Sequence, residues 1–347
     1  MMAESTFLVV QPGVLTTIQD LGRFGYGSIG MPAAGAMDPY AHQLANLMVG
    51  NSLHEATLEM TFIGPTLVSK GSHRIALAGG DLGAELNEIP LPSCGSWTMR
   101  EGDTLTFKGG SGVRSYLAVA GGWDVETVLG SKSTYTRAKL GGYQGRPLKK
   151  EDSLNVGSIV TSLRWQGSLP MNLVDEFFST EKPIRVLWGP QDDYFSEKEK
   201  ARLLEQSWTV NKDSDRIGYR LDGNPLIHLD KKESISDGVC QGAIQVPGHG
   251  QPIVLLADAQ TTGGYPKIAT IISSDLGRPA HYKAGDFIQF QSVTYEEAIQ
   301  IMKERQQQIH FVQDWIQSRE RATSHLWHIY IDSKHYRVRV DEKPENQ

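Results

Sequence analysis

The chain has 347 residues, 39% of them hydrophobic, with 36 glycines, 16 prolines and a formal net charge of −6. This length suits two domains with substantial cores, and the glycine and proline content is typical of a turn-rich protein. Because the charge is modest and spread along the chain, it argues against nucleic-acid and anionic-membrane partners. No stretch approaches the roughly 18 apolar residues of a membrane span, and Met1–Glu4 lacks the basic region of a signal peptide.

The two cysteines, Cys94 and Cys240, lie far apart and outside any C-x-x-C pattern. This spacing argues against a disulfide framework and predicts a protein of the reducing cytoplasm. His325 and His328 lie three apart, but their segment alternates like a strand and no further ligands cluster beside them. We therefore expect packing or surface roles for both histidines and no metal site.

Short apolar and β-branched runs, each bounded by glycine, proline or polar turn residues, dominate the sequence. Those of the first half are Thr6–Val10, Thr66–Val68, Arg74–Ala78, Ser96–Met99, Thr104–Phe107 and Ser115–Val119. Runs of this length and punctuation predict a mainly β fold with many strands and few helices.

Three segments carry helix-start signals. They are Asp38-Pro39, with an end at Gly50-Asn51; Ser196 with Glu199, to about Gln206; and Thr294 with Glu297, to about Arg321. The last helix opens a C-terminal extension, residues 294–347. There Leu326–Ile331 and Tyr336–Val340 alternate around Asp332-Ser333-Lys334, which predicts a hairpin before the polar tail Asp341–Gln347. We expect the hairpin to dock on the folded body or on a partner.

The second half of the chain repeats features of the first. Three pairs recur in the same order: Asp20–Tyr26 with Asp215–Tyr219, Gly64 to Ala78 with Gly242 to Ala257, and Gly102–Phe107 with Gly285–Phe290. Three ordered pairs favour duplication over chance. We therefore predict two similar β domains, residues 1–165 and 183–293.

The first glycine-rich segment with chemical interest runs from Thr17 to Arg23 and on to Asp38. Glycine lets backbone amides approach a ligand closely, and Arg23 is able to hold a carboxylate or a phosphate through two parallel hydrogen bonds. The alternative is a long loop whose glycines serve turns and whose arginine pairs with Asp20.

The second segment, Gly130–Thr134, combines Ser131 and other small hydroxyls with Lys132. These groups suit an oxyanion, but the segment lacks the G-x-x-x-x-G-K-[ST] spacing of a nucleotide-binding loop. A turn with surface charges is the alternative.

The third segment follows the apolar run Ile253–Ala257, so that its polar side chains emerge together at a strand end. Lys267 is suited to neutralise developing negative charge and Asp258 to accept a proton, while Gln260 and Tyr265 are suited to orient a small polar substrate. The alternative is a plain Gly263-Gly264-Tyr265-Pro266 turn. We expect function here before the other two segments.

Read together, these segments resemble the biotin-dependent carboxyltransferase-like family. The resemblance rests on Thr17–Arg23, Gly35–Asp38, Ala45-Asn46 with Val49–Asn51, Tyr116–Gly122, Gly130–Thr134 and Asp258–Lys267, and it spans about Phe7 to Phe290. The family includes KipA, which is the C subunit of the bacterial 5-oxoprolinase, the proteins named allophanate hydrolase subunit 2, and the carboxyltransferase domain of urea carboxylase.

The resemblance implies two cyclophilin-like β-barrel domains with a shared cleft between them. It implies catalytic roles for Arg23, Asp258 and Lys267, and substrate contacts from Gln19, Asp38, Ser131, Gln260, Thr262, Gly263, Gly264 and Tyr265. It also implies an ATP-dependent complex with KipI-like and LamB/YcsF-like subunits, which opens 5-oxo-L-proline to L-glutamate.

Two alternatives remain within the same resemblance. A KipA-type protein can act as a regulatory partner that antagonises the kinase inhibitor KipI, which makes the cleft dispensable. A carboxyltransferase-like protein that acts on urea or allophanate ranks lower, because the chain contains no Met-Lys-Met biotin attachment sequence.

Overall fold

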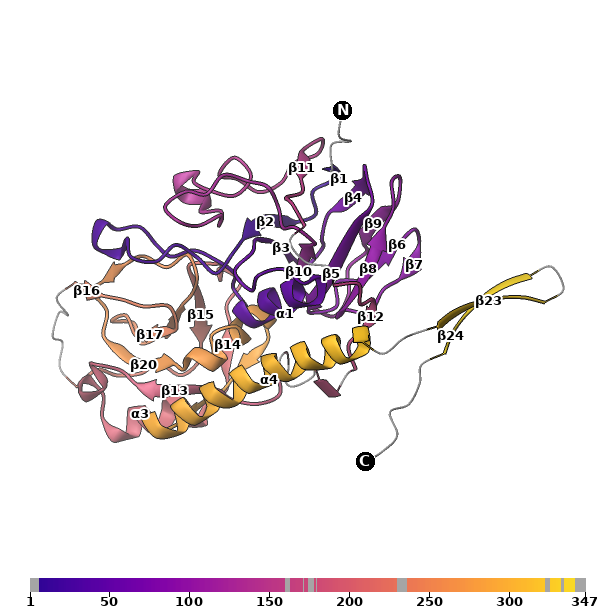
Figure 1. Ribbon diagram of the computed structural model, residues 1–347. Helices are drawn as coiled ribbons and strands as arrows, with labels where there is room; N and C mark the ends of the chain where they lie inside the picture. Colours follow the sequence, from indigo (N-terminus) through magenta and orange to yellow (C-terminus); the bar gives the residue numbers. More distant parts are fainter. Residues whose placement is uncertain are drawn as a thin grey trace.

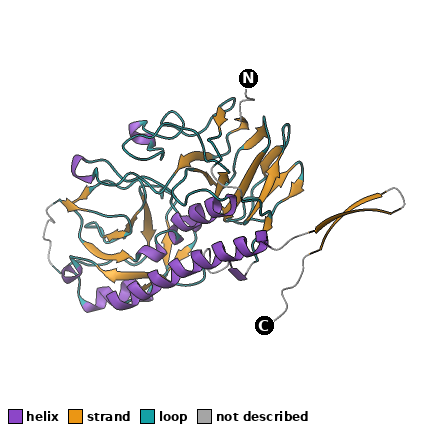
Figure 2. Cartoon of the chain, viewed as in Figure 1, coloured by secondary structure: helices purple, strands orange, loops and turns teal. Residues whose placement is uncertain are grey.

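The computed structural model describes residues 6–159, 163–170, 172–173, 178, 180–229, 236–321, 325–331 and 334–340, and from residue 321 onward it describes the backbone alone. Strands joined by long loops form both halves of the body, and the longer helices lie together on one side of it (Figure 2). The predicted mainly β fold is therefore confirmed.

The first half of the chain builds two six-stranded sheets whose described pairings are antiparallel. The first sheet, in spatial order, is β11 (Ser153–Asn155), β1 (Thr6–Gln11), β4 (Thr66–Ser69), β9 (Thr104–Phe107), β6 (Ala84–Leu86) and β7 (Ile89–Pro90). The second is β12 (Gly167–Ser168), β8 (Gly95–Met99), β5 (His73–Gly79), β10 (Arg114–Val119), β3 (Thr57–Thr61) and β2 (Leu15–Gln19).

Apolar side chains from both sheets meet in one core. Phe7 and Leu67 of the first sheet belong to the same buried cluster as Leu58, Ile75 and Leu117 of the second. Alternate residues of a strand point to opposite faces, so each sheet contributes every second residue to this layer. The other face of the second sheet remains to be covered.

Helix α1 (Pro39–Val49) covers that outer face (Figure 1). Asp38 caps it as predicted, accepting hydrogen bonds from the amides of Tyr40 and Ala41, and it ends at Gly50, whose φ of 75° is the left-handed C-cap geometry. Because α1 has the sheet on one side and helix α4 (Tyr295–Arg321) on the other, most of its side chains are buried.

The second half forms a single eight-stranded sheet that curls into a nearly closed barrel. Its order is β21 (Phe287–Ile288), β14 (Trp208–Val210), β15 (Gly218–Asp222), β18 (Ile253–Leu255), β17 (Ala243–Gln245), β20 (Lys267–Ile271), β13 (Ile184–Trp188) and β22 (Phe290–Ser292). The two outermost strands, β21 and β22, are separated in the chain by Gln289 alone, so the sheet must curl until its edges are neighbours. A second core, which includes Val186, Trp208 and Ile244, fills the interior.

The remaining short elements lie on the connections. The two-stranded sheet consists of β16 (Asp237–Gly238) and β19 (Thr262–Gly263), and helix α3 is Glu197–Glu205. The 3-10 turns are η1 (Gly27–Ile29), η2 (Thr136–Ala138), η3 (Asp192–Tyr194), η4 (Ser273–Asp275) and η5 (Arg278–His281).

The repeated Gly-Asp motif adopts the same turn in both halves. The amide of Arg100 donates to the Asp103 carboxylate over 2.6 Å, and the amide of Lys283 donates to the Asp286 carboxylate over 2.8 Å. The glycines between them, Gly102 and Gly285, have φ values of 85° and 90°, which glycine adopts most readily. The duplicated sequence thus produces duplicated local structure; that the two halves superpose as domains 1–165 and 183–293 stays a prediction.

Helix α4 runs along both halves (Figure 1). Its start forms the predicted capping box, in which the Thr294 amide donates to the Glu297 carboxylate over 2.7 Å and the Glu297 amide donates to the Thr294 hydroxyl over 3.2 Å. Towards its end, Val312 and Ile316 are buried against α1 in the first half. The C-terminal extension therefore belongs to the folded body as far as Arg321.

Beyond α4, the predicted hairpin is present as β23 (His325–Ile331) and β24 (Lys334–Val340), paired in register from His325–Val340 to Ile331–Lys334. The turn residues Asp332-Ser333 and the polar tail 341–347 lie outside the described residues. Figure 1 shows the hairpin projecting away from the body, so the expected docking on the body is not seen, and docking on a partner stays a prediction.

We expect deletion of residues 322–347 to weaken co-purification with the partner proteins of the complex while the Tm of the remaining chain changes by less than about 2 °C. An isolated hairpin is marginal in water and contributes little to stability unless it docks. Size-exclusion chromatography of the reconstituted complex, beside differential scanning fluorimetry of the single chain, measures both quantities. A truncated chain that assembles normally yet loses turnover would place the tail in the active site instead.

Candidate functional site

A cavity of about 300 Å³ opens between the two halves of the chain. The first half contributes Arg23 and the loop that follows it, through Ala33. The second half contributes Val239–Gln241 and the end of the strand-to-turn segment from Leu256 to Thr261. Its lining combines apolar atoms with an arginine and the Gln260 amide, as is common in small-molecule sites.

Arg23 is a deeply buried residue of this cavity wall, with only 1% of its surface exposed. Its Nη2 donates to the carbonyl of Ser133 over 2.5 Å. Within the described part of the chain, its Nε and Nη1 are buried and find no hydrogen-bond partner. Burial lowers the pKa of the guanidinium, and the nearby charges of Asp20 and Asp258 oppose that effect. Arg23 is therefore a buried cation that retains hydrogen-bonding capacity.

The segment Gly130–Thr134 packs against Asp20 rather than facing the cavity. Ser131 donates its hydroxyl to Asp20 over 2.7 Å, the Lys132 amide donates to the same carboxylate over 2.6 Å, and Ser133 donates its hydroxyl as well. Burial alone would raise the pKa of Asp20, but these hydrogen bonds outweigh it and lower the pKa. Lys132 meanwhile binds Glu55 over 2.6 Å. The hydroxyls, amide and ammonium of this segment thus bind Asp20 and Glu55 of the same half of the chain.

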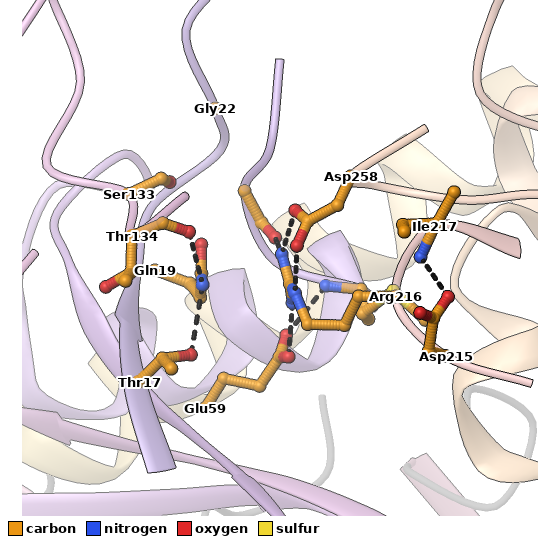
Figure 3. A network of polar contacts seen from close by, with 12 residues as sticks. Thr17, Gln19, Gly22, Glu59, Ser133, Thr134, Asp215, Arg216, Ile217 and Asp258 are labelled. Atoms are coloured by element: carbon orange, nitrogen blue, oxygen red, sulfur yellow. Dashed lines mark hydrogen bonds and ion pairs between the residues drawn. The ribbon is translucent and has the colours of Figure 1, made fainter. Parts of the chain in front are cut away.

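Gln19 and Asp38, two expected substrate contacts, also have internal partners. Gln19 ends β2, and its amide nitrogen donates to the Thr17 hydroxyl and the Thr134 carbonyl over 3.0 and 3.2 Å (Figure 3). Asp38 caps α1 and its other oxygen lies 2.7 Å from Nε2 of His281, which belongs to the second half. Asp38 therefore joins the two halves.

Arg216 makes the main polar connection between the halves (Figure 3). Its Nε and Nη2 donate to the two oxygens of Asp258 over 3.0 and 2.8 Å, in the bidentate geometry. Its Nη1 donates to Glu59 on β3 over 2.5 Å, and Nη2 also donates to the Gly35 carbonyl over 2.7 Å. We call Arg216, Glu59 and Asp258 the Arg216 cluster.

The electrostatic surroundings favour the charged forms of Arg216 and Glu59. Burial lowers the pKa of Arg216, but the Glu59 and Asp258 carboxylates outweigh it and raise the pKa above its usual value. Burial raises the pKa of Glu59, but Arg216 and Arg114 outweigh it and lower the pKa. Tyr116 supports Glu59 by donating its hydroxyl over 2.8 Å. Arg216 and Glu59 therefore stay ionised near neutral pH.

The third predicted segment, Asp258–Lys267, spreads over several environments. Gln260 lines the cavity, whereas both oxygens of Asp258 are held by Arg216. Thr262 and Gly263 form β19 and pair with β16. Lys267 starts β20, where its Nζ donates to Asp237 over 2.7 Å and to the Gly238 carbonyl over 2.9 Å.

Gly264 and Tyr265 complete the turn before Lys267; the Tyr265 side chain is 49% exposed and its carbonyl accepts from Gln245 over 3.3 Å. Of the predicted site residues, the structure therefore brings Arg23 and Gln260 to one cavity and Asp258 close behind it. Lys267 lies outside the cavity lining, where it contacts Asp237 and Gly238 of β16. The next residue of the chain, Val239, lines the cavity. The functional roles of all these residues stay predictions.

Reasoning from sequence missed Arg216 and Glu59. The only signal for Arg216 was its place in Asp215-Arg216-Ile217-Gly218, the partner of the repeat around Arg23. The two repeats share an Asx turn, in which Asp20 accepts from the Gly22 amide and Asp215 from the Ile217 amide, each over 2.8 Å.

His42 on α1 is buried behind this site, with Nδ1 2.9 Å from the Thr57 hydroxyl. Burial lowers its pKa to about 4, against the opposing charges of Asp20 and Glu59. An unfolded histidine titrates near 6.5, so the unfolded chain binds more protons as the pH falls from about 6.5 to 4. Stability is therefore present above pH 6.5 and is lost below it.

We expect the free energy of unfolding to fall by about 2 kcal/mol more between pH 7 and pH 5 in the wild type than in His42→Gln. Urea unfolding at both pH values measures this difference, and the other histidines cancel because both proteins contain them. Parallel pH dependences of the two proteins would show that His42 is not held neutral.

Among the described helices, none is both long and apolar enough to cross a membrane. Cys94 is buried, and Cys240 is exposed at the cavity. Across the residues that the structure describes, no three His, Cys, Asp or Glu side chains form a group suited to hold a metal ion.

Residues 29–292 match the carboxyltransferase domain, subdomains A and B. The chain is 38% identical to the C subunit of 5-oxoprolinase from Escherichia coli (strain K12) over 300 residues, which cover 86% of this chain and 94% of that protein. It is 35% identical to the C subunit of 5-oxoprolinase from Haemophilus influenzae over 291 residues, covering 84% of this chain and 92% of that one.

The crystal structure of the K. lactis urea amidolyase has the same fold over 89% of this chain and 20% of its own, with a TM-score of 0.82 and 30% identity. The match in sequence covers most of the chain and the match in structure covers both halves. The chain therefore belongs to the carboxyltransferase-domain family that includes the C subunit of 5-oxoprolinase.

Proposed function

We propose that this chain is the C subunit of an ATP-dependent 5-oxoprolinase, which cleaves 5-oxo-L-proline to L-glutamate together with KipI-like and LamB/YcsF-like subunits. The two relatives named as C subunits of 5-oxoprolinase match nearly their whole length to this chain. The observation that carries the proposal is the cavity between the halves, which Arg23 and Gln260 line.

The size and lining of this cavity suit a small polar ring compound. A volume of about 300 Å³ lies at the lower end of small-molecule sites, which favours a five-membered lactam over a nucleotide-sized ligand. Buried cations and amide groups stabilise negative charge as it develops on a carbonyl oxygen.

The proposed reaction of the complex converts 5-oxo-L-proline, ATP and two waters to L-glutamate, ADP and inorganic phosphate. The lactam C–N bond breaks, and the ring nitrogen becomes the amine of glutamate. Unstrained lactams resist hydrolysis, so coupling to ATP is a chemically reasonable way to activate the amide oxygen. We keep the predicted roles of Lys267, to stabilise charge on that oxygen, and of Gln260, the Gly263-Gly264 turn and Tyr265, to orient the ring. Of these residues, Gln260 lines the cavity and the others lie outside its lining. We assign Asp258 a positioning role through Arg216, because both of its oxygens already accept hydrogen bonds.

The residues of Gly130–Thr134 do not fit a phosphate-binding loop. The Lys132 amide donates to Asp20, the Thr134 amide donates to the Ile18 carbonyl, and the Lys132 ammonium binds Glu55. We therefore assign the use of ATP to the complex and not to this segment of the chain. The low cysteine count of the chain is consistent with a cytoplasmic complex.

A second candidate is action on urea or allophanate. The similarity to the K. lactis urea amidolyase, with a TM-score of 0.82, favours it specifically. The regulatory alternative, binding to a KipI-like partner without turnover, makes no use of the cavity.

Reconstitution of the three-protein complex tests the proposal. We expect L-glutamate and ADP to form in equal amounts from 5-oxo-L-proline and ATP, and no glutamate to form when this chain is omitted. Urea as substrate provides the second arm. An assembled complex that releases no glutamate overturns the proposal; ATP cleavage with urea instead supports the second candidate, and assembly without either activity supports the regulatory one.

A further inference from the structure

We infer that Arg23 is the receptor for a carboxylate group on the substrate of the cavity between the halves. This inference deepens the function proposed above and rests on it for the identity of the ligand, 5-oxo-L-proline, which carries one carboxylate beside its lactam. The binding chemistry itself rests on the surroundings of Arg23.

The first observation is the unused hydrogen-bonding capacity of this guanidinium. Nη2 gives one hydrogen to the Ser133 carbonyl over 2.5 Å, while Nε and Nη1 are buried without a partner among the described residues. Leaving buried charged donors unpaired is costly, and native proteins rarely do so away from functional sites. A ligand that supplies acceptors would remove this cost.

The second observation concerns geometry. A guanidinium presents two edges, Nε with Nη2 and Nη1 with Nη2, and each edge offers two parallel N–H groups to a carboxylate. Whichever hydrogen Nη2 gives to Ser133, its other hydrogen lies parallel to an N–H of a nitrogen that has no described partner. One complete bidentate edge therefore stays available.

The third observation is that the neighbouring carboxylates are already occupied. Asp20 accepts from Ser131, Ser133 and the amides of Gly22 and Lys132. Asp258 is held on both oxygens by Arg216. Both carboxylates lie close enough to influence the pKa of Arg23, yet each has its own set of donors. The two carboxylates therefore favour the charged form of Arg23 but leave its Nε and Nη1 without an acceptor among the described residues.

The backbone around Arg23 is built to admit this side chain. A β-carbon on Gly141, whose φ is 65°, would lie 2.7 Å from Nη2 of Arg23 and 2.2 Å from the Ser133 carbonyl oxygen. A side chain there would push the guanidinium out of its position. Gly141 thus leaves the space that the Arg23 guanidinium occupies.

The loop after Arg23 is held at its base and exposed at its tip. Its base is pinned by hydrogen bonds from the Arg23 amide to the Ala33 carbonyl and from the Ala36 amide to the Asp20 carbonyl, each over 2.8 Å. Its tip is exposed, with Phe24 at 72% and Ile29 at 73%. Because Nε and Nη1 of Arg23 are covered in this structure, binding of a carboxylate there requires this exposed tip to move outward.

Binding of three matched compounds to the assembled complex, measured by isothermal titration calorimetry, tests the inference. They are 5-oxo-L-proline, its carboxamide, and 2-pyrrolidinone, which lacks the whole group. We expect the wild type to bind the carboxylate about tenfold or more tightly than the carboxamide. Arg23→Gln should reduce that ratio to about one, and Arg23→Lys, which keeps the charge but loses the fork, should give an intermediate ratio.

Arg74→Gln is the matched control, because Arg74 also has a buried nitrogen without a described partner but lies on β5, outside the cavity. It should leave the ratio unchanged. A wild-type ratio near one, or a ratio that survives in Arg23→Gln, overturns the inference and indicates that water satisfies the guanidinium. Inorganic phosphate that binds the wild type as tightly as 5-oxo-L-proline, and loses binding in Arg23→Gln, overturns the carboxylate assignment in favour of phosphate.

These outcomes separate from failure of the proposed function. Turnover of 5-oxo-L-proline with an unchanged ratio in Arg23→Gln sinks the inference and leaves the function intact. Conversely, a complex that forms no glutamate and still prefers the carboxylate in a way that depends on Arg23 overturns the proposed function. That result supports the inference that Arg23 binds a carboxylate.

Discussion

Arg216→Met should destabilise the chain by about 3–5 kcal/mol, the largest effect we expect from a single substitution. Removal of the guanidinium leaves Glu59 and Asp258 buried without their main counterion, and Glu59 is only 2% exposed. The substitution also removes the principal ionic link between the two halves. Urea unfolding should therefore show a lower midpoint and a transition that separates into two steps.

Arg220→Met provides the control, because Arg220 lies on the neighbouring strand β15 with its side chain exposed. We expect it to change stability by less than about 0.5 kcal/mol. The combined variant Glu59→Gln, Arg216→Met, Asp258→Asn should recover part of the loss, since it leaves no uncompensated charge. Equal stability of the Arg216 and Arg220 variants would show that the cluster contributes little.

Lys267→Met should lower turnover of the reconstituted complex by about 10²- to 10³-fold while the Tm of the chain changes little. The loss of turnover is the size expected when one group that stabilises a developing oxyanion is removed. Stability is spared because the partner carboxylate, Asp237, is 61% exposed and such pairs contribute little. Steady-state kinetics and thermal unfolding measure the two effects separately.

Asp237→Asn distinguishes a catalytic lysine from a structural ion pair. It breaks the same contact of 2.7 Å but leaves the ammonium in place. We expect turnover within about threefold of the wild type. Equal losses in Lys267→Met and Asp237→Asn, or a large fall in Tm in either, would mean that the pair holds β16 and β19 together and that Lys267 has no direct role in the reaction.

The sequence predicted those features that depend on local residues. Asp38, Ser196 and Thr294 start helices because short polar side chains satisfy free amides in the first turn, whatever the surrounding fold. Strands β2 and β3 were not predicted. Their threonine-rich sequences, LTTIQ and TLEMT, resemble polar loops, and they are strands because β3 is hydrogen-bonded between β2 and β10.

The site was less predictable, because its decisive contacts join distant positions. Arg216 and Glu59 are 157 positions apart, and Asp38 and His281 are 243 apart. Single-residue chemistry identified Arg23, Asp258 and Lys267 as interesting charges but gave no indication of their partners. The partner decides the role, as Asp258 illustrates: a free carboxylate at a strand end suggests a base, whereas one held on both oxygens is suited to positioning.

The closure of the second-half barrel governs the order in which the chain can fold. Ile184 on β13 pairs in parallel with Phe290 on β22, which lies 106 positions later in the chain. The first strand of the barrel can therefore complete its pairing only after this stretch has been synthesised. At about 5–20 residues per second, a ribosome needs roughly 5–20 seconds to supply that stretch. Until then β13 is an uncovered edge, which favours pairing with other chains. Because α4 follows β22 directly and packs on both halves, it can join them only after the barrel strands have been synthesised.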